Sequence, residues 1–379
     1  MTPIRVGVNL LWLQPGAAGG SEDYVIRLLR AMAAGGAEAH DVELTLLCNR
    51  RFPEAHPELA AASHVVVAPV DGSSRPRRIL AESTWVAAAS ARRRFDVVHH
   101  TNQVLPPVRS RRSALTVHDL RPLVHPDTTP SGQGRYLRAR FGPSVRAAAV
   151  VMTPSEFVRQ SVIERLRARP ERVLVVSAPL LPTGAAATGE RAVPYFIYPA
   201  VTQPHKNHLT LLRAFAQVCE ARSEVTLALP GGAGAAEAMI AAEVARLGLD
   251  DRVERLGRIP RLDLDRLISG ATALVYPSRY EGFGIPLAEA MALGCPVIAA
   301  DATALPEVVG DAGILVDPGD VEGWATAMLG LVDDEKRRAE LAAAGRDRVR
   351  SLPLTPSEAA DRLAQAYRLA AAAGGGRNR

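Results

Sequence analysis

The chain has 379 residues, a formal net charge of +5 and three cysteines. This length is sufficient for two domains with well-buried cores, and the small positive charge gives no indication of a nucleic-acid partner. No apolar run is long enough to cross a bilayer and the cysteines are odd in number and far apart, so the sequence predicts a cytoplasmic protein without disulfides or membrane-spanning segments.

The first predicted element is a strand at 4–10, followed by a glycine-rich turn and a helix. Within the turn, Gly19 and Gly20 would let the backbone approach a ligand closely, and Ser21 is a favourable helix N-cap. A flexible turn explains the same residues equally simply. The pattern lacks G-x-G-x-x-G, so it carries no dinucleotide fingerprint.

Strand-like runs continue through the first half of the chain, with helical patterns or loops between them. This alternation predicts a parallel sheet covered by helices on both faces. His118 follows one of these strands, at the sheet edge where open α/β proteins bind ligands, although a structural role is about as common for a single histidine. The adjacent His99 and His100 point to opposite faces and make a poor metal pair. The runs are 42–48, 64–70, 96–99, 113–117, 147–152 and 173–177.

Arginines gather between these strands, at 75–78, 92–94, 109–112 and 135–146. Solvated surface charge explains most such groups. The alternative is a basic face that meets an anionic acceptor or a membrane surface, which would place the protein peripherally at the inner face of the membrane.

A segment rich in Pro, Gly and Ala predicts a linker at 184–194 between an N-terminal domain at 1–183 and a C-terminal domain at 195–355. A helix is predicted at 356–372, where it could pack back on the N-terminal domain, and 373–379 reads as a disordered tail. The second domain repeats the alternation of strands and helices. The fold class is therefore α/β, with two Rossmann-like, doubly wound domains that face each other across a ligand-binding cleft.

The most informative stretch runs from Tyr276 to Met291. A buried strand leads through two glycines into a helix with Pro286 in its first turn, where the missing N–H costs nothing. The N–H groups between Gly284 and Leu287 would suit an anion, because a helix start gathers unpaired donors. Two carboxylates, Glu281 and Glu289, flank this turn. A phosphate between two hydroxyl-binding carboxylates describes a sugar nucleotide.

Lys206 lies between a strand and a helix, where an ammonium group could neutralise a departing diphosphate. An ordinary exposed lysine is the simpler reading of the local sequence. Pro230 to Gly234 forms another strand-to-helix turn at the same edge of the predicted sheet, a weak signal by itself.

Nearly the whole chain resembles the retaining glycosyltransferases of family 4, which have the GT-B fold. The most specific match is the E-x7-E segment from Glu281 to Glu289, and the N-terminal matches are looser. Other matching segments are Lys206 before its helix, 250–257, 296–299, 306–311, 313–318, 19–22 and 116–119.

The resemblance implies a role for each matching residue. Glu289 would bind the ribose hydroxyls, and Glu281 would face the donor sugar. Lys206 would bind the diphosphate, and His118 would lie near the sugar and the reacting centre, so His118, Lys206 and Glu281 are the catalytic candidates. The donor-binding set is completed by backbone and side-chain neighbours of the sugar and phosphates, namely Gly19, Gly20, Gly282, Phe283, Gly284 and Ile285.

One position departs from the family pattern. Many members have an arginine six residues before the lysine, whereas this chain has Ala200. Neutralisation of the diphosphate would then depend more on Lys206, with help from His205 or another residue. The segment from Tyr198 to His208 is similar to a branch that contains mannosyltransferases, a weak indication of GDP-mannose as donor.

The implied reaction moves a hexose from a nucleoside-diphosphate sugar to an acceptor hydroxyl with front-face attack and retention. No cofactor or metal is expected, since no metal-binding carboxylate motif stands out and the acidic residues at 263–265 suit a helix start. Glu281 as a covalent nucleophile is a minority hypothesis.

The alternatives are another GT-B enzyme, an epimerase or a phosphorylase, and a non-catalytic protein that binds nucleotide sugars. The sequence leaves the acceptor open among a glycan, a lipid-linked intermediate and a small natural product. It also leaves the oligomeric state open.

Overall fold

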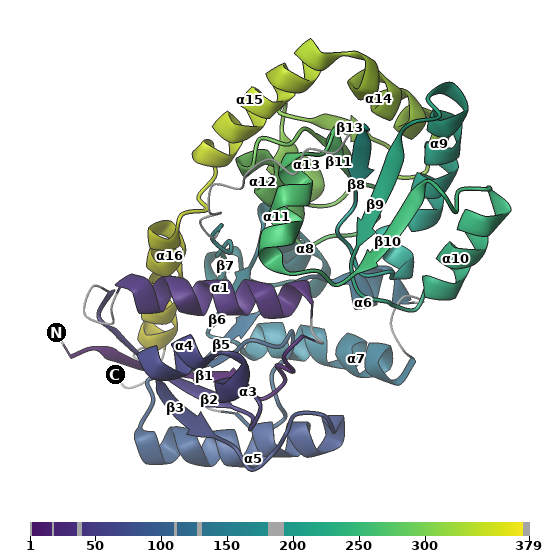
Figure 1. Ribbon diagram of the computed structural model, residues 1–379. Coiled ribbons are helices and arrows are strands. Elements are labelled where there is room, and N and C mark those ends of the chain that lie inside the picture. Colours follow the sequence, from purple (N-terminus) through teal and green to yellow (C-terminus); the bar gives the residue numbers. More distant parts are fainter. Residues whose placement is uncertain are drawn as a thin grey trace. The chain divides into compact units, whose positions relative to one another are not determined.

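The computed structural model describes residues 2–16, 19–35, 40–109, 112–126, 131–180 and 193–373. The chain forms two compact units (Figure 1). Unit 1 comprises residues 1–181 together with 353–379, and unit 2 comprises 182–352. The predicted linker as far as residue 192, and the predicted tail from residue 374, lie outside the described residues.

Unit 1 is built on a sheet of seven parallel strands in the order β3-β2-β1-β4-β5-β6-β7. The strands are β1 (Ile4–Leu10), β2 (Val42–Cys48), β3 (His64–Val67), β4 (Val97–His100), β5 (Ser113–Thr116), β6 (Val150–Thr153) and β7 (Val173–Val175). The helices described before residue 181 are α1 (Gly20–Gly35), α3 (Phe52–Ala55), α4 (Pro57–Ala62), α5 (Arg75–Arg93), α6 (Arg121–Val124), α7 (Ser131–Ala147), α8 (Glu156–Leu166) and the 3-10 turn η2 (Pro170–Arg172). Strands β4, β5 and β6 are buried at every residue, because helices cover both faces of the sheet.

Helix α16 (Pro356–Ala372) is the last element in sequence and belongs to unit 1. It begins with a capping box between Thr355 and Glu358 and with Pro356 in its first turn. Its alanine-rich face packs on α1 and on strands β1, β4, β5 and β6, where Tyr367 is fully buried. The core of unit 1 therefore includes residues from both ends of the chain.

Unit 2 is built on a six-stranded parallel sheet in the order β10-β9-β8-β11-β12-β13. Its strands are β8 (Tyr195–Ile197), β9 (Thr226–Pro230), β10 (Val253–Gly257), β11 (Ala273–Tyr276), β12 (Val297–Ala300) and β13 (Ile314–Val316). Its helices are the 3-10 turn η3 (Pro204–Lys206), α9 (His208–Ala221), α10 (Glu237–Arg246), α11 (Arg261–Ser269), α12 (Ile285–Ala292), α13 (Leu305–Val309), α14 (Val321–Asp333) and α15 (Glu335–Ser351). The prediction of two doubly wound α/β domains is confirmed.

Each sheet reverses its strand order at one place. In unit 1 the reversal falls between β1 and β4, and in unit 2 it falls between β8 and β11. Open α/β sheets bind ligands outside the carboxyl ends of the strands at such a point. The residues that follow these four strands are therefore the first candidates for function.

Element boundaries differ from the sequence prediction at one instructive place. The apolar run at 147–152 was predicted as one strand, but β6 begins only at Val150, because α7 continues to Ala147. The run begins with alanine, which is both apolar and a strong helix former. Composition alone therefore does not show where the helix ends and the strand begins.

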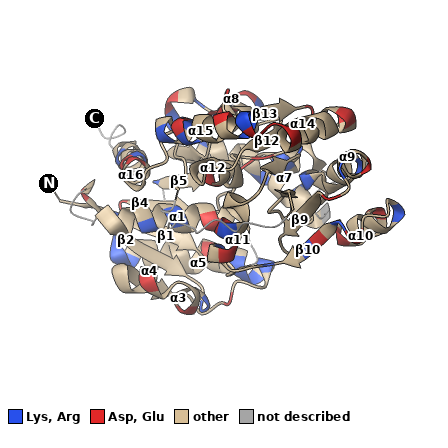
Figure 2. Ribbon diagram, turned by 45° about the horizontal axis from the view of Figure 1, so that its top comes forward, with Lys and Arg blue, Asp and Glu red and all other residues tan. Residues whose placement is uncertain are grey.

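Charges of both signs are interspersed over the helices of both units, as on α15 (Figure 2). No helix in the described ranges is long and apolar enough to cross a membrane. Cys48, Cys219 and Cys295 are free thiols, and burial raises the pKa of Cys48 to about 11 and that of Cys295 to about 12.

Candidate functional site in unit 2 and its counterpart in unit 1

Lys206 ends the 3-10 turn that follows β8, and its ammonium group contacts one side chain at the end of β11 and one in the loop that follows this strand. Its Nζ lies 2.6 Å from Glu281 Oε1 and 3.3 Å from the Tyr276 hydroxyl group. The side chains of Lys206 and Glu281 are only 17% and 14% exposed. Two predicted site residues, 75 positions apart, therefore form a largely buried ion pair at the carboxyl edge of the sheet.

Asn207 fixes the backbone that presents Lys206. It adopts a left-handed conformation with φ of 60°, which asparagine tolerates better than most residues. Its side-chain amide donates to the carbonyl groups of Pro277 (3.0 Å) and Pro318 (2.7 Å). The turn is thereby attached to the chain just after β11 and just after β13.

The Glu281 carboxyl group is held in its ionised form. Burial by itself would raise its pKa, but the Lys206 charge, hydrogen bonds from Lys206 and Ser278, and the charge of His205 together bring the pKa below its ordinary value. Its backbone N–H donates to Thr303 Oγ1 at 3.1 Å, which orients the loop. Glu281 is therefore an oriented, ionised carboxylate, and its role as a covalent nucleophile stays a minority hypothesis.

Two tyrosines support this pair, and sequence reasoning missed both. Tyr276 ends β11 and Tyr198 follows β8, with their rings edge to face at 5.3 Å. Burial raises the pKa of Tyr276 well above its usual range, and the Glu281 charge adds to the effect. The phenol therefore stays protonated beside Lys206. Tyr198 donates its hydroxyl hydrogen to the carbonyl group of Lys206 at 2.8 Å.

Helix α12 begins at the predicted glycine turn. Gly284 has φ of 112°, a conformation that requires glycine, and a Cβ atom there would also lie 2.9 Å from Leu305 Cδ2. The expectation of available N–H groups as far as Leu287 was too broad, because the Leu287 N–H donates to the Gly284 carbonyl group at 3.0 Å. The donors ahead of Pro286 are those of Gly284 and Ile285, and Gly282 and Phe283 precede them as half-buried residues.

Glu289 is buried on α12 and pairs with an arginine that sequence reasoning did not identify. Its Oε1 accepts a hydrogen bond from Arg261 Nη1 at 2.6 Å. Arg261 Nε lies 2.8 Å from Asp265 Oδ1, one turn later on α11. The predicted ribose ligand is thus oriented by an ion-pair chain that joins α11 to α12. The two acidic residues at 263–265 thus form ion pairs within α11, Asp265 with Arg261 and Asp263 with Arg266.

At Ala200, where many family members have an arginine, the backbone of Gly231 packs directly against the chain. Ala200 lies so close to Gly231 that a Cβ atom on this glycine, which has φ of 155°, would overlap the Ala200 carbonyl oxygen. The Arg258 guanidinium group lies against the next glycine, with Nε 3.0 Å from the place of a Cβ on Gly232. Arg258 is therefore a cation near this edge of unit 2.

His118 lies in unit 1, directly after β5 and Val117. Its Nε2 is 2.9 Å from the Thr101 carbonyl oxygen, which can only accept, so Nε2 carries the hydrogen and Nδ1 the lone pair in the neutral ring. Burial lowers the pKa of His118, although the bond to Thr101 and the Asp119 charge oppose this effect. The ring packs edge to face against Tyr24 at 5.2 Å.

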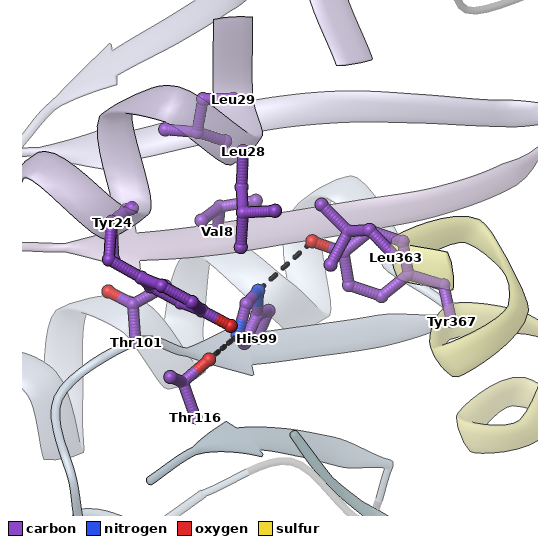
Figure 3. A pocket seen from close by; sticks show the side chains of 10 residues that line it. Val8, Tyr24, Leu28, Leu29, His99, Thr101, Thr116, Leu363 and Tyr367 are labelled. Atoms are coloured by element: carbon purple, nitrogen blue, oxygen red, sulfur yellow. Dashed lines mark hydrogen bonds between the residues drawn. The ribbon is translucent and has the colours of Figure 1, made fainter. Parts of the chain in front are cut away.

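His99 has a structural role. It contacts Tyr367 of α16 through Nδ1 (3.0 Å) and Thr116 of β5 through Nε2 (2.8 Å), as Figure 3 shows. The adjoining cavity, lined also by Tyr24 and Leu363, measures about 10 Å³. This is about enough for one water molecule and far too small for a sugar.

Gly19 and Gly20 begin α1, also in unit 1. Gly19 has φ of 61°, and a Cβ atom on either glycine would meet nothing within 4 Å. A side chain at either position would therefore have room, and close approach of a ligand to this backbone stays a prediction. Within the described ranges, no three His, Cys, Asp or Glu side chains are grouped so that they could hold a metal ion.

Comparisons with known proteins agree with this architecture. Residues 189–348 match the family described as glycosyl transferases group 1, and residues 18–179 match the one described as glycosyltransferase family 4. The O-antigen chain mannosyltransferase B of Escherichia coli is 31% identical, over 66% of this chain and 69% of that protein. The O-antigen chain mannosyltransferase RfbU of Salmonella typhimurium (strain LT2) is 28% identical, over 82% and 87%.

A solved structure gives the same fold. Sucrose-phosphate synthase from Thermosynechococcus elongatus superposes with a TM-score of 0.74, at 22% identity, over 96% of this chain and 98% of that one. Two Rossmann-like units with these matches define a GT-B glycosyltransferase. The chain belongs to glycosyltransferase family 4.

Proposed function

We propose that this protein transfers a hexose, with GDP-mannose as the preferred donor, to an acceptor hydroxyl group with retention of configuration and without a metal ion. The observation that carries the proposal is the 2.6 Å pair between Lys206 and Glu281 at the carboxyl edge of the unit 2 sheet. The names of two mannosyltransferase relatives support mannose as the sugar and a growing glycan as the acceptor.

A buried ion pair is a weak means of stabilising a fold, since desolvation offsets most of the attraction. Its value here is that it holds an ammonium group where phosphate arrives. As the bond between the sugar and the diphosphate breaks, its electron pair moves to the diphosphate oxygen, and Lys206 stabilises that charge. One preorganised group of this kind contributes about 3–4 kcal/mol to lowering a barrier.

The other groups position the donor in this proposal. Glu289, oriented by Arg261, accepts hydrogen bonds from the ribose hydroxyl groups. Glu281 remains ionised and faces the sugar as positive charge develops at its anomeric carbon. His118 offers its Nδ1 lone pair to a sugar hydroxyl group. The acceptor attacks the face that the diphosphate leaves, and its proton passes to the departing phosphate oxygen.

The test is release of nucleoside diphosphate from a panel of GDP-, UDP-, ADP- and TDP-sugars, preceded by a thermal-shift screen of the same ligands. We expect GDP-mannose to give turnover that survives EDTA, with an anomeric configuration in the product equal to that of the donor. Inversion would refute the proposed stereochemistry, and activity lost with EDTA would refute metal independence. Binding without turnover over a broad acceptor panel would identify a binding protein instead.

A further inference from the structure

The loop after β4 binds His118 through two different residues. Thr101 comes directly after β4, and His118 lies shortly after the neighbouring parallel strand β5, so both are at the carboxyl edge of the unit 1 sheet. The Thr101 carbonyl group accepts the hydrogen bond from His118 Nε2 at 2.9 Å. Gln103 Oε1 accepts a second hydrogen bond, from the backbone N–H of His118, at 3.0 Å. One loop therefore holds both the ring and the backbone of this histidine.

Thr101 is itself fixed through its hydroxyl group. Its Oγ1 donates to the Asn9 carbonyl group at 2.8 Å and accepts from Trp12 Nε1 at 2.7 Å. An indole N–H can only donate and a carbonyl oxygen can only accept, so the hydroxyl hydrogen has one possible direction. The side chain is 1% exposed, and water does not compete for these bonds. The residue that receives the His118 ring is thus attached to β1 and to the segment that follows it.

Gln103 adopts a strained conformation while it binds the neighbouring loop. Its Oε1 must face the N–H of His118, so its Nε2 points to Asp119 and lies 3.4 Å from Oδ1. The backbone is left-handed, with φ of 54°, which is unfavourable for a residue other than glycine. Such strain persists where the surroundings over-determine it, and it is concentrated at functional sites.

The second nitrogen of the His118 ring is left available. The residue is 7% exposed, and Nδ1 does not belong to the buried atoms that lack a hydrogen-bond partner in the described residues. Since none of these residues bonds to Nδ1, solvent reaches it. The rings of Tyr24 and Trp12 pack against the imidazole, with centroids at 5.2 and 6.1 Å, and restrict its rotation. The histidine therefore presents a lone pair in a single direction.

We propose that Thr101 and Gln103 are positioning residues of the transferase, which hold His118 in the tautomer and rotation that present its Nδ1 lone pair to a hydroxyl group of the donor sugar. Neither residue needs to touch the donor. A ring free to exchange tautomers would present an N–H at Nδ1 part of the time, and the acceptor would then be lost. The contact with the sugar rests on the proposed function, whereas the fixed tautomer does not.

The first test is a nuclear magnetic resonance spectrum of protein labelled in its histidine rings, with the His118 signals identified by their loss in His118→Gln. Protonated and unprotonated ring nitrogens resonate far apart, so the spectrum reports the tautomer. We expect hydrogen on Nε2 alone in the native protein, and a mixture of tautomers in Thr101→Val and in Gln103→Met. Thr101→Ser keeps the hydroxyl group and should restore the native signals. A native spectrum in both Thr101→Val and Gln103→Met would overturn the proposal.

Thr116→Val is the matched control. The Thr116 hydroxyl group lies 2.8 Å from Nε2 of a different histidine, His99, and Thr116 is as buried as Thr101. This variant should lower the thermal midpoint about as much as Thr101→Val and leave the His118 signals unchanged. An equal change of those signals in Thr116→Val would show general loosening of the sheet and refute specific positioning. Gln103 is only half-buried, so Gln103→Met should fold even if Thr101→Val does not.

The second test measures kcat/KM for GDP-mannose and for its monodeoxy analogues. We expect one analogue, which lacks the hydroxyl group that faces His118, to lose about tenfold with the native enzyme. This penalty should fall below about threefold in Thr101→Val and Gln103→Met, because the parent donor loses the same contact, and it should persist in Thr116→Val. A full penalty in both positioning variants would overturn the proposal.

Failure of the proposed function gives a different result. If His118→Gln keeps the full penalty for every analogue, the contact between His118 and the sugar is refuted, and the positioning role is refuted with it. The spectrum would still show the fixed tautomer in that case. A tautomer mixture in the native protein, in contrast, would refute the positioning by Thr101 and Gln103 while leaving transfer from the nucleotide sugar unaffected.

Discussion

Replacing Lys206 by alanine perturbs both stability and chemistry, and the two effects can be separated. The variant leaves Glu281, whose side chain is 14% exposed, without the ammonium group at 2.6 Å. Removing one partner of a fully buried pair costs about 3–5 kcal/mol, and residual solvent access reduces this to about 2–3 kcal/mol here. For a unit of this size the thermal midpoint should fall by about 5–10 °C.

The catalytic effect is larger and has a different cause. Loss of one preorganised group that stabilises the leaving diphosphate should lower kcat by about 10²–10³-fold. In the double variant Lys206→Ala/Glu281→Gln the carboxylate is replaced by an uncharged amide. We expect this variant to regain most of the thermal midpoint and none of the lost kcat.

The assays are thermal unfolding followed by circular dichroism and initial rates of nucleoside diphosphate release at saturating donor. Two results would refute the reasoning. One is a kcat for Lys206→Ala within about threefold of the native value. The other is a double variant that regains kcat together with stability, since the loss would then arise from the unpaired carboxylate and not from the missing ammonium group.

Glu289→Gln should raise the donor KM by about tenfold with little change in kcat, because it weakens a ribose contact made equally in the ground and transition states. Initial rates over a range of donor concentrations measure both constants. An unchanged KM would contradict the assignment of Glu289 to the ribose. Unit 1 should lose stability as pH falls from about 6.5, where unfolded histidine begins to bind protons, toward the folded pKa of His99 of about 3. The free energy of unfolding should change by at most about 1.4 kcal/mol per pH unit because of this residue. The pH dependence should diminish in His99→Gln when thermal midpoints are compared between about pH 4.5 and 7. An equal pH dependence in the variant would exclude His99 as its source. Gly231→Ala should prevent folding of unit 2, since its Cβ would overlap the Ala200 carbonyl oxygen, whereas Gly248→Ala, also at positive φ but with nothing within 4 Å, should cost only about 1 kcal/mol. Similar unfolding midpoints for the two glycine variants would show that steric overlap is not the cause.

Local patterns predicted the features that depend on neighbouring residues. The apolar run ending at Tyr276 predicted β11, and the glycine turn before Pro286 predicted the start of α12. Both predictions succeed because each depends on the chemistry of only a few neighbouring residues. The doubly wound class followed from alternation of such elements. The roles of the individual site residues remain predictions.

Contacts between distant segments could not be predicted in the same way. Arg261 reaches Glu289 across 28 positions, because strand order brings the starts of α11 and α12 to one edge. An arginine in a helical first turn four residues before an aspartate, as at 261–265, was the one local signal that pointed to Arg261.

The placement of α16 on unit 1 has a consequence for how the protein is made. A ribosome finishes β7 near residue 175 but supplies the helix that covers α1 and strands β1, β4, β5 and β6 only when residue 372 has emerged. At about 5–20 residues per second, the intervening synthesis takes roughly 10–40 s. During this interval the nascent first unit exposes the apolar surface that will receive Tyr367, while all of unit 2 is being synthesised. Newly made chains should therefore depend on chaperones until the final helix docks.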